Sequence, residues 1–286
     1  MTTSGGVWRD GRRAAVSLTF DNLGEAAELE LGLDAGDQPP EGHYSVTTAL
    51  PIVLEELERA GLGATFFVEG LNAELYPAAL TRITGAGHEV AYHAWRHEDW
   101  SGLDPAQERK NIERGLEAMR AIGISPAGFR PPGGLLNEGT RQLLADAGLL
   151  YCSPAGTGAG IDEVVVLPFA WPAVDAYHVL PTFASLRRHI SGSDEAGGPE
   201  AVRSSLLAAI EDAVATAGHV SVVLHTWMAE LERGALRDVL ARVTEGAARG
   251  ELWAARCDEV ARWIVAHPAE FPDAPLLDRT SWMEPA

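Results

Sequence analysis

The chain has 286 residues, 46% hydrophobic and 22% charged, a composition typical of a soluble globular protein with a sizeable core. Its 22 lysines and arginines against 41 aspartates and glutamates give a net charge of -19, which disfavours nucleic acid and anionic membranes as partners. No apolar run approaches the ~20 residues of a membrane span, and residues 1–10 lack the apolar stretch of a signal peptide. Cys152 and Cys257 lack metal-type spacing, so we expect a cytoplasmic protein without a disulfide framework.

The pattern along the chain alternates between strands and helices. A first buried strand covers residues 15–20 and stops at Asp21 and Asn22, and residues 23–44 follow as a long aperiodic loop. Further strands are predicted at 64–68, 89–92, 127–129, 149–152, 163–169 and 219–224. Helices are predicted at 46–61, 75–86, 104–123, 137–148, 200–217, 235–250 and 258–267. Residues 187–198 read as a loop, and the tail 268–286 need not be ordered.

This alternation, with no internal repeat or linker, predicts one α/β domain over residues 1–286 with a core of about 14–267 and a mostly parallel sheet. The helix after Asp104 has the clearest start, because Asp104 can cap it, Pro105 suits its first position and Gln107 completes a capping box. No glycine-rich phosphate loop follows the first strand, so a closed barrel with helices outside is favoured over an open dinucleotide-binding sheet.

Polar side chains stand at the carboxyl ends of the predicted strands, where parallel α/β folds place their chemistry. Four such residues each end a different strand, and a fifth lies just past another: Asp21, His93, Arg130, His225 and Asp175. Because these strand ends converge on one face of a barrel, we expect the five side chains to share a site there.

A metal site is indicated by His93 and His97, which are four residues apart. In a helical turn both imidazoles would lie on one face and reach one ion. A third ligand would come from an oxygen of Asn22 or Asp21 at the end of the first strand.

Alternatives remain open for the other polar residues. Arg130, in a turned segment with two prolines and two glycines, either orients a carboxylate or is a surface residue. His225 is either a general acid or a hydrogen-bonded core histidine. Tryptophans near these groups either wall a pocket or fill the barrel mouth, and they are Trp95, Trp100, Trp171 and Trp227. Cys152 is expected to be a buried small hydrophobe.

Five motifs in order resemble the polysaccharide deacetylase family, the carbohydrate esterases built on the NodB homology domain. They are Thr19-Phe20-Asp21-Asn22, then Ala64-Thr65-Phe66-Phe67-Val68-Glu69-Gly70, then Gly87-His88-Glu89 through His93 to His97, then Arg130-Pro131-Pro132-Gly133-Gly134, and finally Val222-Val223-Leu224-His225. The resemblance implies a distorted (β/α)7 barrel with one divalent metal, often zinc, that hydrolyses an amide, usually an N-acetyl group on a sugar.

The resemblance also implies roles for individual residues. Asp21 would be the general base, His93 and His97 metal ligands, Arg130 the partner that holds Asp21, and His225 the acid that protonates the leaving amine. The family's second aspartate, a metal ligand, is Asn22 here, so the ion would be held weakly or be absent. Gly133 replaces a common aromatic residue, and Asp175 is a candidate for orienting the acid. The long insert and the lack of an export signal are more similar to the branch of allantoinases and cyclic imide hydrolases.

We therefore expect a hydrolase of non-peptide C–N bonds that acts on an acetamido sugar or a small cyclic or linear amide. One alternative is a non-catalytic barrel that binds a carbohydrate or other ligand through a decayed metal site. Another is metal-independent hydrolysis through Asp21 and His225. We expect no nucleic-acid or membrane partner, and self-association into a homo-oligomer stays open.

Overall fold

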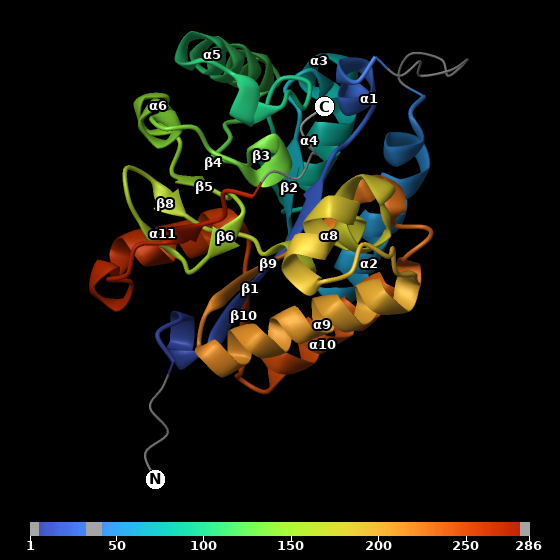
Figure 1. Ribbon diagram of the computed structural model, residues 1–286, viewed down its shortest axis with the longest axis vertical. Coiled ribbons are helices and arrows are strands. Elements are labelled where there is room, and N and C mark those ends of the chain that lie inside the picture. The colour runs from blue at the N-terminus through green and yellow to red at the C-terminus, as the bar shows by residue number, and fades with distance from the viewer. Residues whose placement is uncertain (1–5, 33–41, 281–286) are drawn as a thin grey trace.

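The computed structural model describes residues 6–32 and 42–280, in which a curled, mainly parallel sheet is surrounded by helices (Figure 1). The strands of this sheet are β1 (Ala14–Asp21), β2 (Thr65–Val68), β3 (Glu89–Tyr92), β4 (Gly128–Phe129), β5 (Tyr151–Cys152), β7 (Gly160–Ile161), β8 (Val165–Val166), β9 (His219–His225) and β10 (Leu252–Ala254). Every residue of β1 is buried, as expected of a strand covered on both faces.

β1 is the centre of the sheet. It pairs in parallel with β9 on one side, and on the other with β10 at its start and β2 at its end. From β2 the sheet continues in parallel through β3, β4, β5 and β8 to the antiparallel β7. Val174, which lies in the segment after β8, forms an isolated parallel bridge with Val223 of β9. The prediction of a distorted barrel is thereby confirmed, although its closure is incomplete.

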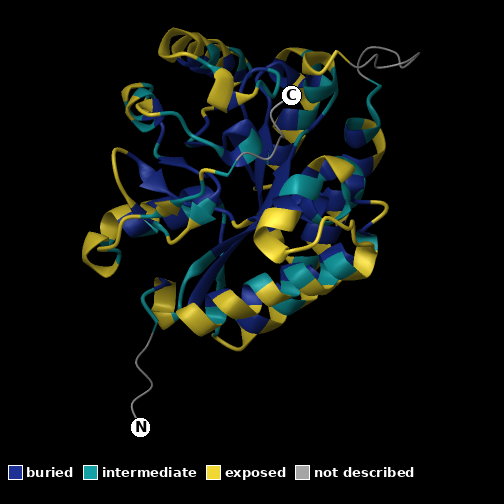
Figure 2. Ribbon diagram, in the orientation of Figure 1, coloured by how far each residue is buried: buried dark blue, intermediate teal, exposed yellow. Residues whose placement is uncertain are grey.

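Helices lie around the outside of the sheet, and their outer faces are exposed to solvent (Figure 2). They are α1 (Ala26–Glu30), η2 (Ser45–Ala49), α2 (Leu50–Ala60), α3 (Asn72–Leu75), α4 (Pro77–Gly85), α5 (Pro105–Ala121), α6 (Thr140–Asp146), α7 (Asp175–Val179), α8 (Ala184–Ser191), α9 (Pro199–Thr216), α10 (Arg233–Ala248) and α11 (Cys257–Ala266). The predicted capping box of α5 is present, with Asp104 accepting from the N–H groups of Ala106 and Gln107. None of the described helices is both long and apolar enough to cross a membrane.

Several predicted boundaries differ from those of the structure. Residues 187–198 are not simply a loop, because α8 extends to Ser191 and the buried Arg187 donates to the carbonyls of Tyr177 and Leu180. The strand predicted at 163–169 is confined to β8. The helix predicted from Asn137 begins at Thr140. The long loop 23–44 contains the short helix α1, and residues 33–41 of it lie outside the described residues.

The carboxyl-terminal tail takes part in the structure as far as residue 280. Strand β11 (Leu276–Leu277) pairs antiparallel with β6 (Gly156–Thr157), and Asp278 N–H donates to the Ala155 carbonyl at 2.9 Å. These pairings, like that of β10 with β1, involve two or three residues each and therefore leave little periodic signal in the sequence.

Candidate active site

Asp21 and Arg130 meet across the barrel mouth. Asp21 is the last residue of β1, and Arg130 directly follows β4. Nη1 of Arg130 donates to Oδ1 of Asp21 at 2.6 Å, and both side chains are almost completely buried. The guanidinium is itself held by Thr19 Oγ1 at 2.9 Å and by Ser153 Oγ at 3.0 Å. Arg130 is therefore a buried partner of a carboxylate, and the alternative of a surface arginine is excluded.

His93 and His97 come together without the helical turn that their spacing suggested. The segment is irregular, with left-handed backbone at Ala94 (φ 61°) and at His97 (φ 74°). The two imidazole centroids are nevertheless 5.0 Å apart. The expectation of a helical turn is wrong, because residues 93–97 are not helical and the left-handed residues Ala94 and His97 set the course of the loop.

The surroundings of both histidines favour the neutral imidazole. Nδ1 of His93 lies 2.8 Å from the carbonyl of Arg130, which can only accept, so Nδ1 carries the proton and Nε2 keeps its lone pair. Burial lowers the pKa of His93 to about 3, and burial together with the neighbouring His93 lowers the pKa of His97 as well. Neutral imidazoles with a free nitrogen fit a divalent cation.

Ligands beyond the two histidines are few. Within residues 6–32 and 42–280, no group of three or more histidine, cysteine, aspartate or glutamate side chains is placed to hold a metal ion. Asn22 is half-buried directly after Asp21 and has left-handed backbone, with φ of 57°. Two imidazoles therefore fit the ion, and a third donor would be a neutral amide oxygen or the already paired Asp21.

His225 and Asp175 form the second polar pair of the site. His225 ends β9 and is the direct register neighbour of Asp21 on β1. Its Nδ1 lies 2.6 Å from Oδ1 of Asp175, and its backbone N–H donates to Oδ2 at 2.7 Å. Burial alone would lower the pKa of His225, but the charge and hydrogen bond of Asp175, with a contribution from Asp21, outweigh it and raise the pKa above its usual value.

The tryptophans divide between core and site. Trp100 is fully buried against Phe129 in the main core, and Trp95 and Trp171 are nearly as buried in two smaller apolar clusters, so these three are packing residues. Trp227 is half-buried, with its ring centroid 5.7 Å from that of His225, and is the one of the four placed beside the polar groups with part of its surface exposed.

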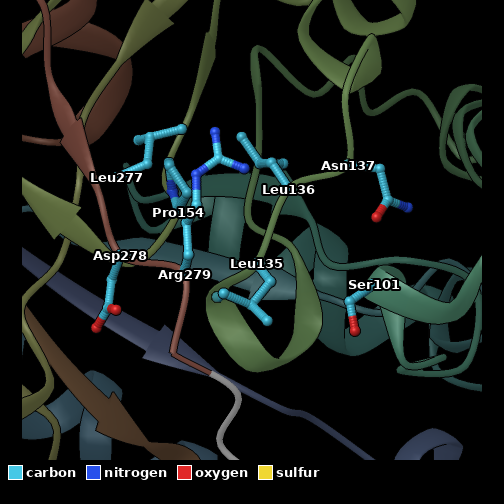
Figure 3. A pocket seen from close by; sticks show the side chains of 9 residues that line it. Ser101, Leu135, Leu136, Asn137, Pro154, Leu277, Asp278 and Arg279 are labelled. Carbon is cyan, nitrogen blue, oxygen red and sulfur yellow. The ribbon is translucent and has the colours of Figure 1, made fainter.

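A hollow of about 190 Å³ lies beside the site, between the segment after Arg130 and the carboxyl-terminal tail. Figure 3 shows Leu277 and Arg279 of the tail next to Leu136. None of the polar pairs described above lines this hollow. The residues that line it are Ser101, Gly134, Leu135, Leu136, Asn137, Pro154, Leu277, Asp278 and Arg279.

The sequence-based prediction gave no role to several residues that hold the polar groups. Thr19 and Ser153 fix the guanidinium of Arg130, and Glu69 is a fully buried carboxyl at the end of β2. Glu69 and Ser153 each directly follow a strand, so the strand-end rule that found Asp21 would also have found them.

Comparison with known proteins assigns the chain to a family. The sequence model for polysaccharide deacetylase matches residues 9–152, just over half of the chain. The chain belongs to the polysaccharide deacetylase family. It is 33% identical over 123 residues to a peptidoglycan-N-acetylglucosamine deacetylase of Bacillus cereus, covering 43% of this chain and 42% of that protein. It is 36% identical over 133 residues to chitin deacetylase 1 of Saccharomyces cerevisiae, covering 46% of this chain and 40% of that protein. The matches thus span less than half of either relative.

Solved structures share the fold over most of the chain. A Mycobacterium smegmatis protein assigned to the polysaccharide deacetylases superposes with a TM-score of 0.80 at 27% identity, covering 96% of both chains. A family 4 carbohydrate esterase from Streptomyces lividans superposes with a TM-score of 0.52 at 21% identity, covering 85% of this chain and 92% of that one. An allantoinase superposes with a TM-score of 0.70 at 18% identity, covering 93% of this chain and 96% of that one, a likeness of fold.

Proposed function

We propose that this protein hydrolyses an amide C–N bond in an acetamido sugar or in a small cyclic or linear amide. The observation that carries the proposal is the pairing of Asp21 with His225 on neighbouring strands, each held by a separate buried partner. A carboxylate and an imidazolium in adjacent positions are the base and acid that amide hydrolysis requires. Membership of the polysaccharide deacetylase family supports an acetamido sugar as the first substrate class to test.

In the proposed mechanism, Asp21 accepts the proton of the attacking water and His225 protonates the leaving amine. Arg130 keeps one oxygen of Asp21 engaged at 2.6 Å, which leaves Oδ2 as the proton acceptor. Asp175 holds Nδ1 of His225, so Nε2 is the nitrogen that delivers the proton. The upward shift in the pKa of His225 keeps it protonated nearer to neutral pH, as a general acid requires.

His93 and His97 are the residues that would hold a divalent cation, with zinc as the first candidate. Such a cation polarises a carbonyl and lowers the pKa of its bound water to about 7. An oxygen of Asn22 would contribute without charge, which predicts weaker binding than a carboxylate in the same position would give.

Turnover of an amide panel tests the proposal. We would assay N-acetylglucosamine oligomers, small linear amides and cyclic imides with wild type, Asp21→Asn and His225→Ala, with exposed His189→Ala as the matched control. Both site variants should lose about 10²–10⁴-fold in kcat, and His225→Ala should keep the zinc content of wild type. Near wild-type rates in His225→Ala would assign leaving-group protonation to another residue. Turnover that survives a chelator would favour the metal-independent route.

A second candidate function is ligand binding without catalysis. It is favoured by Asn22, which removes a charge from the site, and by the lack of a cluster of three or more ligating acidic, histidine or cysteine side chains in the described residues. Binding of a sugar or amide, measured by calorimetry, with no turnover across the panel would support this candidate over hydrolysis.

A further inference from the structure

The turn that follows β1 has an unusual backbone. Asn22 and Gly24 both have left-handed φ angles, of 57° and 71°. A non-glycine residue adopts this conformation rarely, and it persists where surrounding contacts hold it. Leu23 lies between them with its side chain buried in the main core. The directions of the Asn22 and Asp21 side chains therefore depend on what fixes this turn.

Glu69 and Asn72 hold both backbone groups of Leu23. The N–H of Leu23 donates to Oε2 of Glu69 at 3.3 Å, and Nδ2 of Asn72 donates to the Leu23 carbonyl. Nδ2 of Asn72 also donates to the same Oε2 at 3.0 Å, which closes a ring of hydrogen bonds. Neither side chain has exposed surface, so no solvent competes for these bonds.

The residues that follow β2, from Glu69 to Asn72, also hold the segment between His93 and His97. Gly70 N–H donates to the Ala94 carbonyl at 2.9 Å, and Leu71 N–H donates to the Trp95 carbonyl at 3.0 Å. These carbonyls lie between His93 and His97. A side chain at Gly70 would place its Cβ 2.9 Å from the Trp95 ring, so the close approach needs glycine. Residues 69–72 thus contact both the turn that carries Asn22 and the loop that carries His93 and His97.

Burial of Glu69 lowers the stability of the fold. Its Oε1 has no hydrogen-bond partner among the described residues. Burial, with a contribution from the charge of Asp21, raises the pKa of Glu69 to about 8. A buried ionisable group with an unpaired oxygen destabilises a protein. A role beyond packing accounts for an acid at this position, where an apolar residue would avoid the cost.

We propose that Glu69 and Asn72 are positioning residues of the candidate active site, whose hydrogen bonds to Leu23 fix the left-handed turn that directs Asn22 and Asp21. The proposal rests on the proposed function for what the site does, but whether the turn is held can be measured without any turnover. Residues that orient ligands or catalytic groups in this way tune affinity and rate by about 10–100-fold when removed.

The test compares hydrogen exchange, zinc affinity and turnover in Glu69→Ala, Glu69→Gln and wild type. The matched control is Glu89→Ala, which removes another nearly buried carboxyl from the opposite end of the sheet, at the start of β3. Glu69→Ala should speed exchange of the Leu23 amide by about tenfold and lower zinc affinity and kcat by about 10–100-fold, with KM little changed. Glu69→Gln keeps an acceptor oxygen and should recover most of each loss. The control should lose stability but keep zinc affinity.

Each outcome decides the proposal. Unchanged exchange of the Leu23 amide in Glu69→Ala would overturn the hydrogen-bonded clamp. Faster exchange without any difference in zinc affinity or kcat from wild type would overturn the positioning role and leave a structural one. If Glu69→Ala does not fold, Asn72→Ala removes the bond to the Leu23 carbonyl and is judged by the same measurements. Absence of turnover in wild type would refute the proposed function, while exchange and zinc affinity would still decide on the clamp.

Discussion

Replacing Asp175 by asparagine should lower the pKa of His225. Oδ1 of Asp175 accepts from Nδ1 of His225 at 2.6 Å, and Oδ2 accepts from its backbone N–H at 2.7 Å. Asparagine offers one oxygen in place of two, so one of these bonds is lost together with the charge. Burial, which by itself lowers the pKa of His225, is then no longer outweighed, and we expect a pKa below the usual 6.5.

The size of the effect follows from the bonds that are lost. A hydrogen bond to a charged group contributes about 1.5–3 kcal/mol, and one pKa unit corresponds to about 1.36 kcal/mol. The pKa of His225 should therefore fall by about one to two units in Asp175→Asn. If protonated His225 is the general acid, kcat at about pH 7 should fall by about tenfold or more, because the protonated fraction shrinks.

The contribution of His225 to the pH dependence of stability should change sign. In wild type the raised folded-state pKa of His225 means that protonation adds stability below its unfolded pKa of about 6.5, and this stability is lost as pH rises through the folded pKa. In Asp175→Asn, protonation of a buried imidazole is unfavourable, so stability should instead decline as pH falls.

Two measurements check this prediction. An NMR titration of the His225 imidazole reports the pKa directly, and urea unfolding at about pH 5.5 and about pH 8 reports the stability. The control is Asp146→Asn, an exposed aspartate of α6. A pKa of His225 in Asp175→Asn equal to or above that of wild type would refute the reasoning.

Three further predictions concern the ion pair, the metal and the core. Arg130→Gln leaves a buried carboxylate unpaired and should lower the free energy of unfolding by about 3–5 kcal/mol, measured by urea denaturation. Asn22→Asp should tighten zinc binding in competition with a chelator, because a charged oxygen replaces a neutral one; equal affinities would mean that Asn22 faces away from the ion. Gly115→Ala would place a Cβ 2.1 Å from a buried tyrosine ring and should cost about 1–3 kcal/mol, whereas Gly85→Ala, with open space around it, should be nearly neutral.

The sequence located the strand ends well because these strands are long enough to carry a pattern or end in a distinctive residue. The direct register of Asp21 with His225 follows from the parallel pairing of two long strands, β1 and β9. The predicted family is confirmed by the match to the family's sequence model, and the predicted distorted barrel is confirmed by the curled parallel sheet. The roles assigned to Asp21, His225 and Asn22 stay predictions.

Tertiary contacts, which the sequence does not show, account for the rest. The turn at His93 and His97 depends on left-handed backbone at Ala94 and His97, and neither residue type favours that conformation strongly enough to be read from the sequence. The strands β10 and β11 consist of two or three residues, and their pairing partners fix them. Glu69 directly follows β2 and is buried like Asp21 at the end of β1, so its place at a strand end is visible in the sequence.

The charges of the site constrain how it can use a cation. His93, His97 and Asn22 are neutral donors, so the charge of a divalent ion would be balanced by Asp21 or by the substrate. Asp21 already pairs with Arg130 at 2.6 Å, and its charge also acts on the pKa of His97 and of His225. A cation that bound Asp21 tightly would take from it the negative charge that a general base needs. Under the proposed mechanism, loose binding of the ion and proton transfer through Asp21 are therefore compatible, and strong binding would lower the rate. For this reason Asn22→Asp should separate the two properties, since the added carboxylate can balance the charge of the ion while placing a second negative charge beside Asp21.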